Sequence, residues 1–328
     1  MTPIAIPGIL DRLAQAGAAG VSLDYPCAAE ELELCQEWGY QFDSKSGQIC
    51  LPFDRDSLVP YWIKNETSPA SWANLSIIGF FETGSTNDEV LQRARGGAPE
   101  GLLVFSETQS SGRGRIGRKW VSTAGAGLYF SFLLRPNCQQ RRWPLLTQAV
   151  SVAMSEALRD LWIHGIVDRE LSIDLKWPND VLLSGKKAAG ILLETAGNEG
   201  AVVGIGVNIS KRSVPEDLKE QAMSIEDETG CMIPRRWLLV RFLENFGRWY
   251  SRFEQGQFTA ILDQWKNSSS MWNNTTIWVT EGGMKRAAKT CGLSDTGGLK
   301  ILTEEGRHEI LLAGDVSVRK SYEPGKGR

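Results

Sequence analysis

Two stretches of the chain carry apolar residues at helical spacing. In residues 143–163, one face of a helix would collect the apolar side chains Leu146, Val150, Met154, Leu158 and Leu161. The second stretch begins at Pro234, which suits the first turn of a helix, and runs through Phe253. Its apolar positions are Leu238, Phe242, Phe246 and either Trp249 or Tyr250. The spacing predicts two long helices that pack against a core.

Between these two stretches the pattern changes to short extended segments. They are Leu171–Lys176, Asp180–Ser184, Ala188–Thr195 and Ala201–Asn208. The turns at Pro178-Asn179 and Ser184-Gly185 are short, so the first pairs of strands should be antiparallel. Residues 65–270 are therefore predicted to form an α+β domain, in which helices cover one face of a central mixed or antiparallel sheet.

Residues 271–328 alternate short strands with glycine-containing turns. The predicted strands are Thr276–Thr280, Lys285–Gly292, Leu299–Thr303, His308–Leu312 and Val316–Arg319. Turns at Gly282-Gly283, Gly297-Gly298 and Glu305-Gly306 separate them. Five strands in so short a segment favour a small SH3-like β-barrel.

Residues 1–64 predict a small domain of another kind. Pro7–Ala16 and Ala28–Gly39 each have the length and pattern of a helix. Tyr40–Leu51 has the pattern of two strands around a Lys-Ser-Gly turn. Helices followed by a hairpin are typical of a winged helix-turn-helix, a common DNA-binding module.

The charge of this first segment disfavours DNA as a partner. Acidic residues outnumber basic ones nine to three through residue 60, whereas a DNA-binding module should present lysines and arginines to phosphate. The stretch Gly17–Cys27 is also too short for an additional helix with its turns. A reduced winged-helix-like domain with a packing role is the favoured interpretation.

Composition excludes several classes of protein. A length of 328 residues predicts two or three compact units, and 42% hydrophobic with 23% charged residues is typical of a globular chain. No apolar run approaches the ~18 residues of a membrane span, and residues 1–14 do not resemble a signal peptide. Six scattered cysteines and two histidines disfavour a zinc site and His-based acid–base chemistry. A cytoplasmic location is expected.

Three glycines and three arginines gather in the segment Ser111–Trp120. Glycine lets a backbone approach a ligand closely, and arginine supplies fixed positive donors. The spacing Gly112-x-Gly114-x-x-Gly117 also matches the dinucleotide fingerprint, which requires a helix directly after it. The aromatic-rich, extended stretch Leu128–Leu134 follows instead. A nicotinamide cofactor is therefore excluded, and an anionic, phosphate-bearing small molecule is favoured.

Further polar blocks surround this arginine loop in the sequence. Gly84–Asp88 precedes a helical stretch, and its side chains would either cap that helix or bind a polar ligand group. Gln109 lies on the strand that leads into the loop. Gly204–Asn208 is a glycine-rich strand that a ligand could approach closely.

Two adjacent hairpins carry a second set of charges. Tight turns should bring Lys176, Asp180 and Lys187 near one end of the sheet, where a lysine could hold a carboxylate or phosphate. An ordinary hairpin with exposed lysines is the alternative for either hairpin taken alone.

In order and spacing these blocks resemble the motifs of biotin protein ligases. The matching segments are Ser85-Thr86-Asn87, Gln109, Gly112-Arg113-Gly114-Arg115-x-Gly117-Arg118-x-Trp120, Lys176-Trp177-Pro178-Asn179-Asp180, Gly185-Lys186-Lys187-x-x-Gly190-Ile191-Leu192-x-Glu194 and Gly204-x-Gly206-x-Asn208. The resemblance implies a catalytic domain like that of class II aminoacyl-tRNA synthetases and agrees with a carboxy-terminal barrel. Bacterial two-function members add a winged helix that represses biotin synthesis.

The family resemblance also implies a two-step reaction. Biotin and ATP, with Mg²⁺, give biotinyl-5′-AMP and pyrophosphate, and a lysine of the biotin carboxyl carrier protein of acetyl-CoA carboxylase then displaces AMP. Both steps place negative charge on phosphate and carboxylate oxygens, so fixed cations should dominate catalysis. The resemblance is compatible with a homodimer, whereas the acidic first segment disfavours DNA as a partner and no membrane partner is expected.

Site residues follow from the same resemblance. Biotin-binding positions are Ser85, Thr86, Asn87, Gln109, Arg113, Gly114, Arg115, Lys187, Gly190 and Gly206. ATP-binding positions are Arg118, Trp120, Lys176, Asn179 and Asn208. Catalytic positions are Lys187, Arg115, Arg118 and Asp180, and the last would orient the acceptor lysine. No residue is predicted as a dedicated metal ligand, because Mg²⁺ should be bound chiefly by phosphate and water.

Two alternative functions stay open at this point. A lipoate or octanoate ligase would share the scaffold, but it is not expected to combine the arginine loop with the Lys-Trp-Pro-Asn-Asp block. A biotin-responsive DNA-binding repressor is disfavoured by the acidic first segment.

Overall fold

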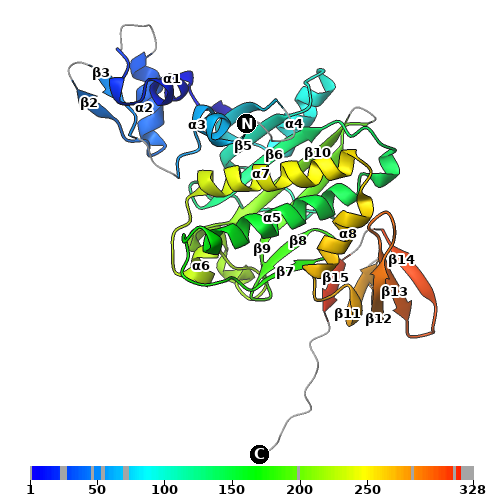
Figure 1. Cartoon of the computed structure of the whole chain (residues 1–328). Helices are drawn as coiled ribbons and strands as arrows, with labels where there is room; N and C mark the ends of the chain where they lie inside the picture. The colour runs from blue at the N-terminus through cyan, green and yellow to red at the C-terminus, as the bar shows by residue number, and fades with distance from the viewer. Residues whose placement is uncertain are drawn as a thin grey trace, which may run out of the picture.

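The computed structural model describes residues 2–22, 28–45, 48–52, 56–68, 74–197, 200–281, 284–312 and 315–318. Within them, a mixed sheet of eight strands forms the centre of the molecule (Figure 1). In spatial order the strands are β1 (Ile4–Ala5), β4 (Ser76–Thr83), β5 (Leu102–Gln109), β6 (Gly127–Leu134), β10 (Ala201–Asn208), β9 (Lys186–Thr195), β8 (Asp180–Leu183) and β7 (Ile173–Lys176). Among the described strands of this sheet, only β4 and β5 are parallel neighbours, so the predicted mixed sheet is confirmed.

Helices cover both faces of this sheet. Helices α5 (Leu145–Ile163) and α7 (Arg235–Glu254) lie side by side across one face, together with α8 (Phe258–Asn267) (Figure 1). The opposite face holds α4 (Thr86–Arg95). Side chains of β5 alternate between the two faces of the sheet. Leu103 and Phe105 belong to the core beneath α5 and α7, whereas Leu102 and Val104 belong to the core beneath α4. The prediction that helices cover only one face was therefore wrong.

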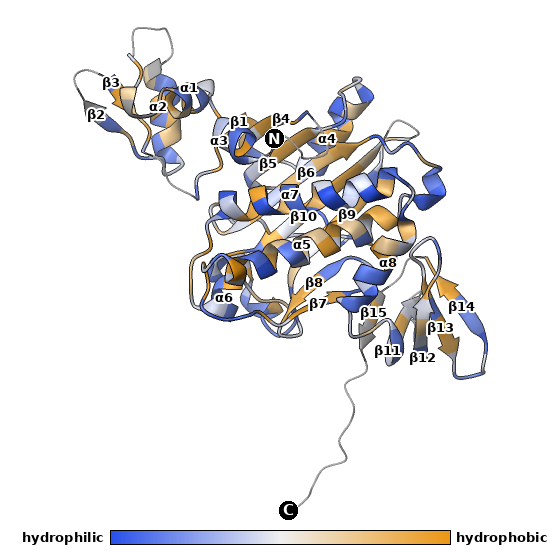
Figure 2. Ribbon diagram, viewed as in Figure 1, coloured by the Kyte–Doolittle hydropathy of each residue, from blue (hydrophilic) through white to orange (hydrophobic). Residues whose placement is uncertain are grey.

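The two long helices confirm the predicted apolar spacing. α5 begins at Leu145, directly after Pro144, and α7 begins at Arg235, directly after Pro234. All the apolar positions predicted to face inward are buried. Figure 2 shows hydrophobic colouring along the central strands, whereas α5 and α7 alternate between hydrophilic and hydrophobic residues, as expected for helices that cover a sheet.

Glu156 on α5 provides a test of pH-dependent stability. Burial raises the pKa of Glu156, while the Trp249 hydrogen bond (3.0 Å) and the charge of Arg248 lower it less. The folded protein therefore binds this proton more tightly than the unfolded chain. The resulting stability is fully present below the unfolded pKa and is lost as the pH rises through the folded pKa.

We expect Glu156→Gln to be more stable than the wild type at pH 7, by up to about 1 kcal/mol. The amide keeps an acceptor for Trp249 and carries no charge that burial would penalise. The advantage should vanish at about pH 3, below the ordinary glutamate pKa of about 4.3, where the wild-type carboxyl is protonated in both the folded and the unfolded state. Urea denaturation at both pH values measures it, and an equal difference at the two would contradict the expectation.

The first part of the chain confirms the predicted helices and hairpin. It contains α1 (Gly8–Ala16), the short 3₁₀ helix η1 (Gly17–Ala19), α2 (Ala28–Glu37), β2 (Asp43–Lys45), β3 (Gln48–Cys50) and α3 (Pro60–Glu66). Part of the predicted hairpin turn, residues 46–47, lies outside the described residues. So do residues 23–27 of the stretch predicted to be too short for a helix.

This part of the chain is also joined to the central sheet. β1 pairs with β4 in the antiparallel direction, which the sequence pattern did not predict. Its small core contains Ile9, Leu10 and Leu13 and extends to Phe81 of β4, on which the Trp38 ring stacks with centroids 5.0 Å apart.

The five predicted strands at the carboxy-terminal end are present. They are β11 (Asn273–Glu281), β12 (Met284–Leu293), β13 (Leu299–Thr303), β14 (His308–Leu311) and β15 (Asp315–Val318). They form an antiparallel sheet in the order β14-β13-β12-β11-β15. The predicted turn residues 282–283 and Arg319 lie outside the described part of the chain. Trp177 is buried against this sheet and donates its Nε1 hydrogen to the carbonyl of Gly297 at 3.0 Å.

Short helices complete the connections. They are η2 (Gln140–Arg142), η3 (Lys211–Ser213), η4 (Glu216–Leu218) and α6 (Ile225–Thr229). Among the helices described, none is both long enough and apolar enough to span a bilayer.

Candidate active site

A single cavity brings together nearly all the residues predicted to act. It lies over β9 and β10, beside the start of α4. Its lining includes Ser85, Thr86, Asn87, Gln109, Arg113, Gly114, Arg115, Arg118, Trp120, Lys176, Asn179, Asp180, Lys187, Gly190 and Gly206. These residues come from segments more than one hundred positions apart in the sequence, so the fold assembles the cavity.

One wall of the cavity is made of neutral polar groups. Ser85 occupies the N-cap position of α4, but its side chain makes no capping hydrogen bond. The Thr86 backbone N–H donates to Gln109 Oε1 at 2.8 Å, and Gln109 Nε2 donates to Ser122 Oγ at 2.9 Å. Ser85 and Thr86 are buried, and both line the cavity. This wall suits an uncharged polar ligand group.

The arginine loop folds back on itself as a short hairpin. Trp120 N–H donates to Gly112 O at 2.9 Å, and Arg118 N–H donates to Arg115 O at 3.2 Å. The two central turn residues have positive φ, 54° at Ile116 and 69° at Gly117. That combination defines a type I′ turn, for which glycine is well suited and a β-branched residue is not. The turn carries Arg115 and Arg118 over the cavity.

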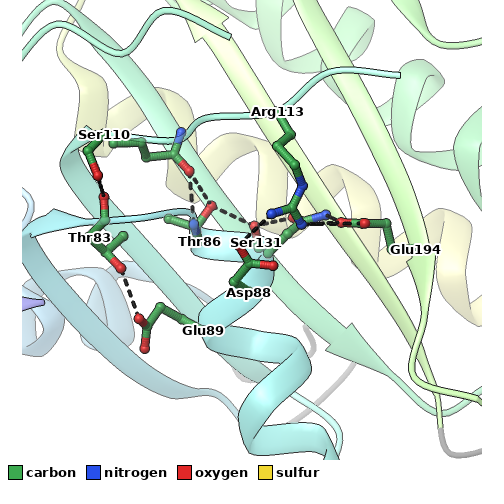
Figure 3. Close-up of polar contacts among 10 residues, drawn as sticks. Thr83, Thr86, Asp88, Glu89, Ser110, Arg113, Ser131 and Glu194 are labelled. Atoms are coloured by element: carbon green, nitrogen blue, oxygen red, sulfur yellow. Dashed lines mark hydrogen bonds and ion pairs between the residues drawn. The ribbon is translucent and has the colours of Figure 1, made fainter. Parts of the chain in front are cut away.

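Arg113 is held between two carboxylates. Figure 3 shows its guanidinium between Asp88 of α4 and Glu194 of β9. The contact with Glu194 Oε2 is 3.1 Å, and Nη1 contacts Asp88 as well. The hydrogen bond to Asp88 raises the pKa of Arg113; burial opposes this shift and Glu194 adds to it. The base of the loop is thereby tied to both α4 and β9.

The floor of the cavity combines a lysine, a carboxylate and an indole. Lys187 Nζ lies 2.6 Å from Asp180 Oδ1 and 5.3 Å from the centroid of the Trp120 ring. Trp120 packs so closely that a Cβ on Gly206 would lie 2.3 Å from it, and one on Gly190 2.8 Å. Glycine at both positions therefore lets the indole lie flat on the strands.

The Lys-Trp-Pro-Asn-Asp block closes the far end. Arg115 Nη1 donates to Asn179 Oδ1 at 3.3 Å, which joins the loop to this block. Asn179 Nδ2 in turn donates to the Ile191 carbonyl at 2.7 Å. The Trp177–Pro178 peptide bond is cis.

Asn208 is the one predicted site residue that does not line the cavity. Its side chain donates to the carbonyls of Lys187 (3.3 Å) and Met223 (3.4 Å) instead. Residues 221–223 also bond to the Lys187 backbone. Asn208, at the end of β10, thus contacts the site through the backbone of Lys187.

Three polar residues near the site had no assigned role among the predicted site residues. Asp88 and Glu194 stood in the blocks quoted from the sequence, and in the structure they hold Arg113. Ser131 stood in none of these blocks; its fully buried hydroxyl contacts Thr86 Oγ1 at 2.7 Å. Its signal in the sequence is that it interrupts a run of aromatic and aliphatic residues.

The cavity is polar and neutral at one end and cationic at the other. Arg115, Arg118, Lys176 and Lys187 surround the second end. Within the described residues, no cluster of three or more His, Cys, Asp or Glu side chains could hold a metal ion. The geometry suits a ligand with an uncharged hydrogen-bonding head and an anionic tail.

Comparisons with known proteins agree on one family. The model of the Biotin/lipoate A/B protein ligase family matches residues 82–210. A biotin–[acetyl-CoA-carboxylase] ligase of Paracoccus denitrificans is 32% identical over 241 residues, which cover 70% of this chain and 96% of the relative. The bifunctional ligase/repressor BirA of Bacillus spizizenii is 29% identical over 289 residues, which cover 86% of this chain and 83% of the relative.

A solved structure has the same fold. The biotin protein ligase from Aquifex aeolicus, in complex with biotin and ATP, superposes with a TM-score of 0.63 and 31% sequence identity. The match covers 75% of this chain and 99% of that protein.

Proposed function

The chain belongs to the biotin protein ligase family, and on that basis we propose that it activates biotin with ATP and transfers the biotinyl group to a lysine of a carrier protein. The observation that carries the proposal is the two-ended cavity. Its neutral wall matches the ureido ring of biotin, and its cationic end matches a carboxylate that meets a triphosphate. One cavity can therefore hold both substrates with their reacting groups adjacent.

The first step forms biotinyl-5′-AMP. A biotin carboxylate oxygen attacks the α-phosphorus of ATP, the bond to the bridging oxygen breaks, and pyrophosphate leaves. Lys187, Arg115 and Arg118 would neutralise the charge that gathers on the phosphate oxygens. Mg²⁺, held chiefly by the triphosphate and water, would add to this neutralisation; among the residues lining the cavity, Asn179 and Asp180 carry the side-chain oxygens that would suit it.

Trp120 supports a place for the adenylate beside the cavity floor. Its Nε1 atom is buried and has no hydrogen-bond partner among the residues described. A buried donor of this kind is costly unless an acceptor reaches it. An oxygen or ring nitrogen of the bound adenylate would supply that acceptor.

The second step transfers the acyl group to the carrier. The neutral amine of the acceptor lysine attacks the acyl carbon, the bond to the AMP oxygen breaks, and the amine loses a proton. Asp180 would orient this amine. The ion pair that Asp180 forms with Lys187 supports the assignment, because it shows that an ammonium group fits within 2.6 Å of this carboxylate.

We also propose roles for the two ends of the chain. The five-stranded antiparallel sheet formed by β11 to β15 is compatible with the SH3-like barrel predicted for residues 271–328, which would complete the catalytic domain of residues 65–270. In residues 1–64, the described helices α1, α2 and the start of α3, with the hairpin of β2 and β3, are compatible with a reduced winged helix. Glu30 and Glu31 in the first turn of α2 support a packing role over binding to DNA.

A transfer assay tests the proposed function. The reaction contains purified protein, ATP, Mg²⁺, biotin and an isolated biotin carboxyl carrier domain, with lipoate as the competing acid. Mass spectrometry should find one biotinyl group on one carrier lysine and no lipoyl group. Lipoylation of the carrier would contradict the proposal and indicate a lipoate ligase. Biotin-dependent DNA binding without transfer would also contradict it and indicate a repressor.

Arg115→Gly should let the activated intermediate escape. The wild-type side chain reaches from the loop to Asn179 and holds the loop over the cavity. Loss of a charged hydrogen bond should speed release of biotinyl-5′-AMP by about tenfold to a hundredfold. Chromatography of the free adenylate, with no carrier present, measures the release.

Ile116→Gly is the matched control for this variant. It places a glycine in the same turn at a positive φ that glycine favours, and it keeps both arginines. It should release much less adenylate than Arg115→Gly. Equal release from both variants would assign the effect to loop flexibility and remove Arg115 from the role of a lid.

A further inference from the structure

A chain of hydrogen bonds runs from Glu194 to the wall of the cavity (Figure 3). Asn87 Nδ2 donates to Glu194 Oε2 at 2.6 Å, and Ser131 Oγ donates to Asn87 Oδ1 at 2.6 Å. Ser131 Oγ also lies 2.7 Å from Thr86 Oγ1. Thr86 and Asn87 line the cavity, whereas Ser131 and Glu194 lie behind them.

The carboxylate of Glu194 fixes the orientation of the Asn87 amide. An ionised carboxylate only accepts hydrogen bonds, and Arg113 donates to the same oxygen of Glu194 at 3.1 Å. Asn87 must therefore present its NH₂ group to Glu194. Its carbonyl oxygen then faces Ser131, whose single hydroxyl proton is used in this bond.

The same reasoning fixes the hydroxyl of Thr86. Because the Ser131 proton points to Asn87, the short contact between Ser131 and Thr86 requires Thr86 to be the donor. Gln109 Oε1 is farther away, at 3.2 Å, and already accepts from the Thr86 backbone N–H at 2.8 Å. Thr86 Oγ1 therefore has only lone pairs left for a ligand.

Gln109 is oriented independently. The Thr86 backbone N–H can only donate, so it draws the side-chain oxygen of Gln109 and turns Nε2 towards Ser122 and the loop. The wall thus offers an acceptor at Thr86 and a donor at Gln109 as neighbours. A cyclic urea, with N–H beside C=O, is complementary to this pair.

We propose that Glu194 and Ser131 are positioning residues that set the hydrogen-bond polarity of the ligand wall, so that Thr86 accepts from a ring N–H and discriminates against rings without one. The inference rests on the proposed function and deepens it by naming two specificity-determining residues outside the cavity. A buried acceptor left without a donor is costly, so a ring oxygen opposite Thr86 is disfavoured twice, by the missing hydrogen bond and by lone-pair repulsion.

The test compares biotin with its two cyclic carbamate analogues, in which one ring N–H is replaced by oxygen. The readout is the ratio of kcat/KM for biotin to that for each carbamate. In Ser131→Ala the Thr86 proton loses its nearer acceptor and keeps only the longer contact to Gln109 Oε1 at 3.2 Å, which the Thr86 backbone N–H already occupies. The proton can then turn towards the ligand, so the ratio for one of the two carbamates should fall by about tenfold. Glu194→Met, which frees the Asn87 amide to flip, should lower the same ratio.

Two further variants separate polarity from simple structural support. Glu194→Gln keeps an acceptor oxygen for Asn87, so it should restore most of the ratio lost in Glu194→Met. Asp88→Asn loosens Arg113 without touching the Asn87–Ser131–Thr86 chain, so it can raise KM but should leave the ratio as in the wild type.

The outcomes distinguish this inference from the proposed function. The inference would be overturned if Ser131→Ala and Glu194→Met, with folding verified by circular dichroism, both kept the wild-type ratio of kcat/KM for biotin to that for each carbamate. Biotin transfer by the wild type would still support the proposed function in that case. Absence of biotin transfer by the wild type would remove the proposed function. Calorimetric dissociation constants for the same three ligands would then report the ratio, and equal binding of biotin and both carbamates would overturn the inference as well.

Discussion

Lys187→Ala should lower the rate of biotin-dependent ATP–pyrophosphate exchange by about a hundredfold to a thousandfold. The ammonium lies on the cavity floor, over the Trp120 ring and beside Asp180, where the reacting carboxylate and phosphate would meet. A fixed positive group at that place stabilises charge that develops only as the oxygen–phosphorus bond forms. Alanine provides no positive charge for this stabilisation. Water that fills the space would have to reorient as the charge develops.

The fold should survive this change. Lys187 is partly exposed, and the ion pair with Asp180 is partly solvated, so its loss should cost no more than about 1 kcal/mol. The backbone contacts of residue 187 with Gln221 and Met223 do not depend on the side chain. Thermal denaturation should therefore give nearly the wild-type midpoint.

Lys186→Ala is the matched control. Lys186 is the adjacent lysine on β9, lies outside the cavity lining and donates to the Lys219 carbonyl at 2.7 Å. It should exchange pyrophosphate at close to the wild-type rate. Full exchange in Lys187→Ala, or equal loss in both variants, would contradict the assignment of Lys187 to the adenylation step.

Arg235→Met should lower the free energy of unfolding by about 3–5 kcal/mol. Arg235 is buried at the start of α7, where Nη1 contacts Glu107 at 2.5 Å and Nη2 contacts Asp56 at 2.9 Å. Burial opposes its charge, but Glu107 and Asp56 outweigh burial and raise its pKa. Without the guanidinium, the Glu107 carboxylate is buried without its positive partner. Most of the lost free energy of unfolding comes from this unpaired, desolvated charge.

The double variant Arg235→Met/Glu107→Gln identifies the cause. Removing both charges should recover most of the lost stability, because an uncharged pair carries no uncompensated desolvation. Urea denaturation of the wild type, both single variants and the double variant gives the coupling energy. Additive losses would show that the two side chains act separately and that the buried pair is not the source of the effect.

Local patterns were enough to predict most elements of the fold. The apolar spacing around Leu158 and Phe242 specified which faces of α5 and α7 are buried, since a helix exposes the same side at every 3.6 residues. Short turns required β7, β8 and β9 to be antiparallel. Glycines 112, 114 and 117 with their arginines indicated an anion-binding loop, because these residue types fix its backbone freedom and its charge.

Other features depend on contacts between distant segments, which no local pattern encodes. The pairing of β1 with β4 and the position of α4 on the second face of the sheet arise from the whole packing arrangement. Asn208 belonged to a motif, yet the register of β10 directs its amide to the backbone of Lys187. Glu194 and Ser131 act through Asn87 across three elements, and only their assembly gives the hydroxyl of Thr86 a direction. Local patterns in the sequence thus specify the elements and the reactive groups. Which of those groups meet, and how their hydrogen bonds point, follows from the folded arrangement, because both depend on distances between residues far apart in the chain.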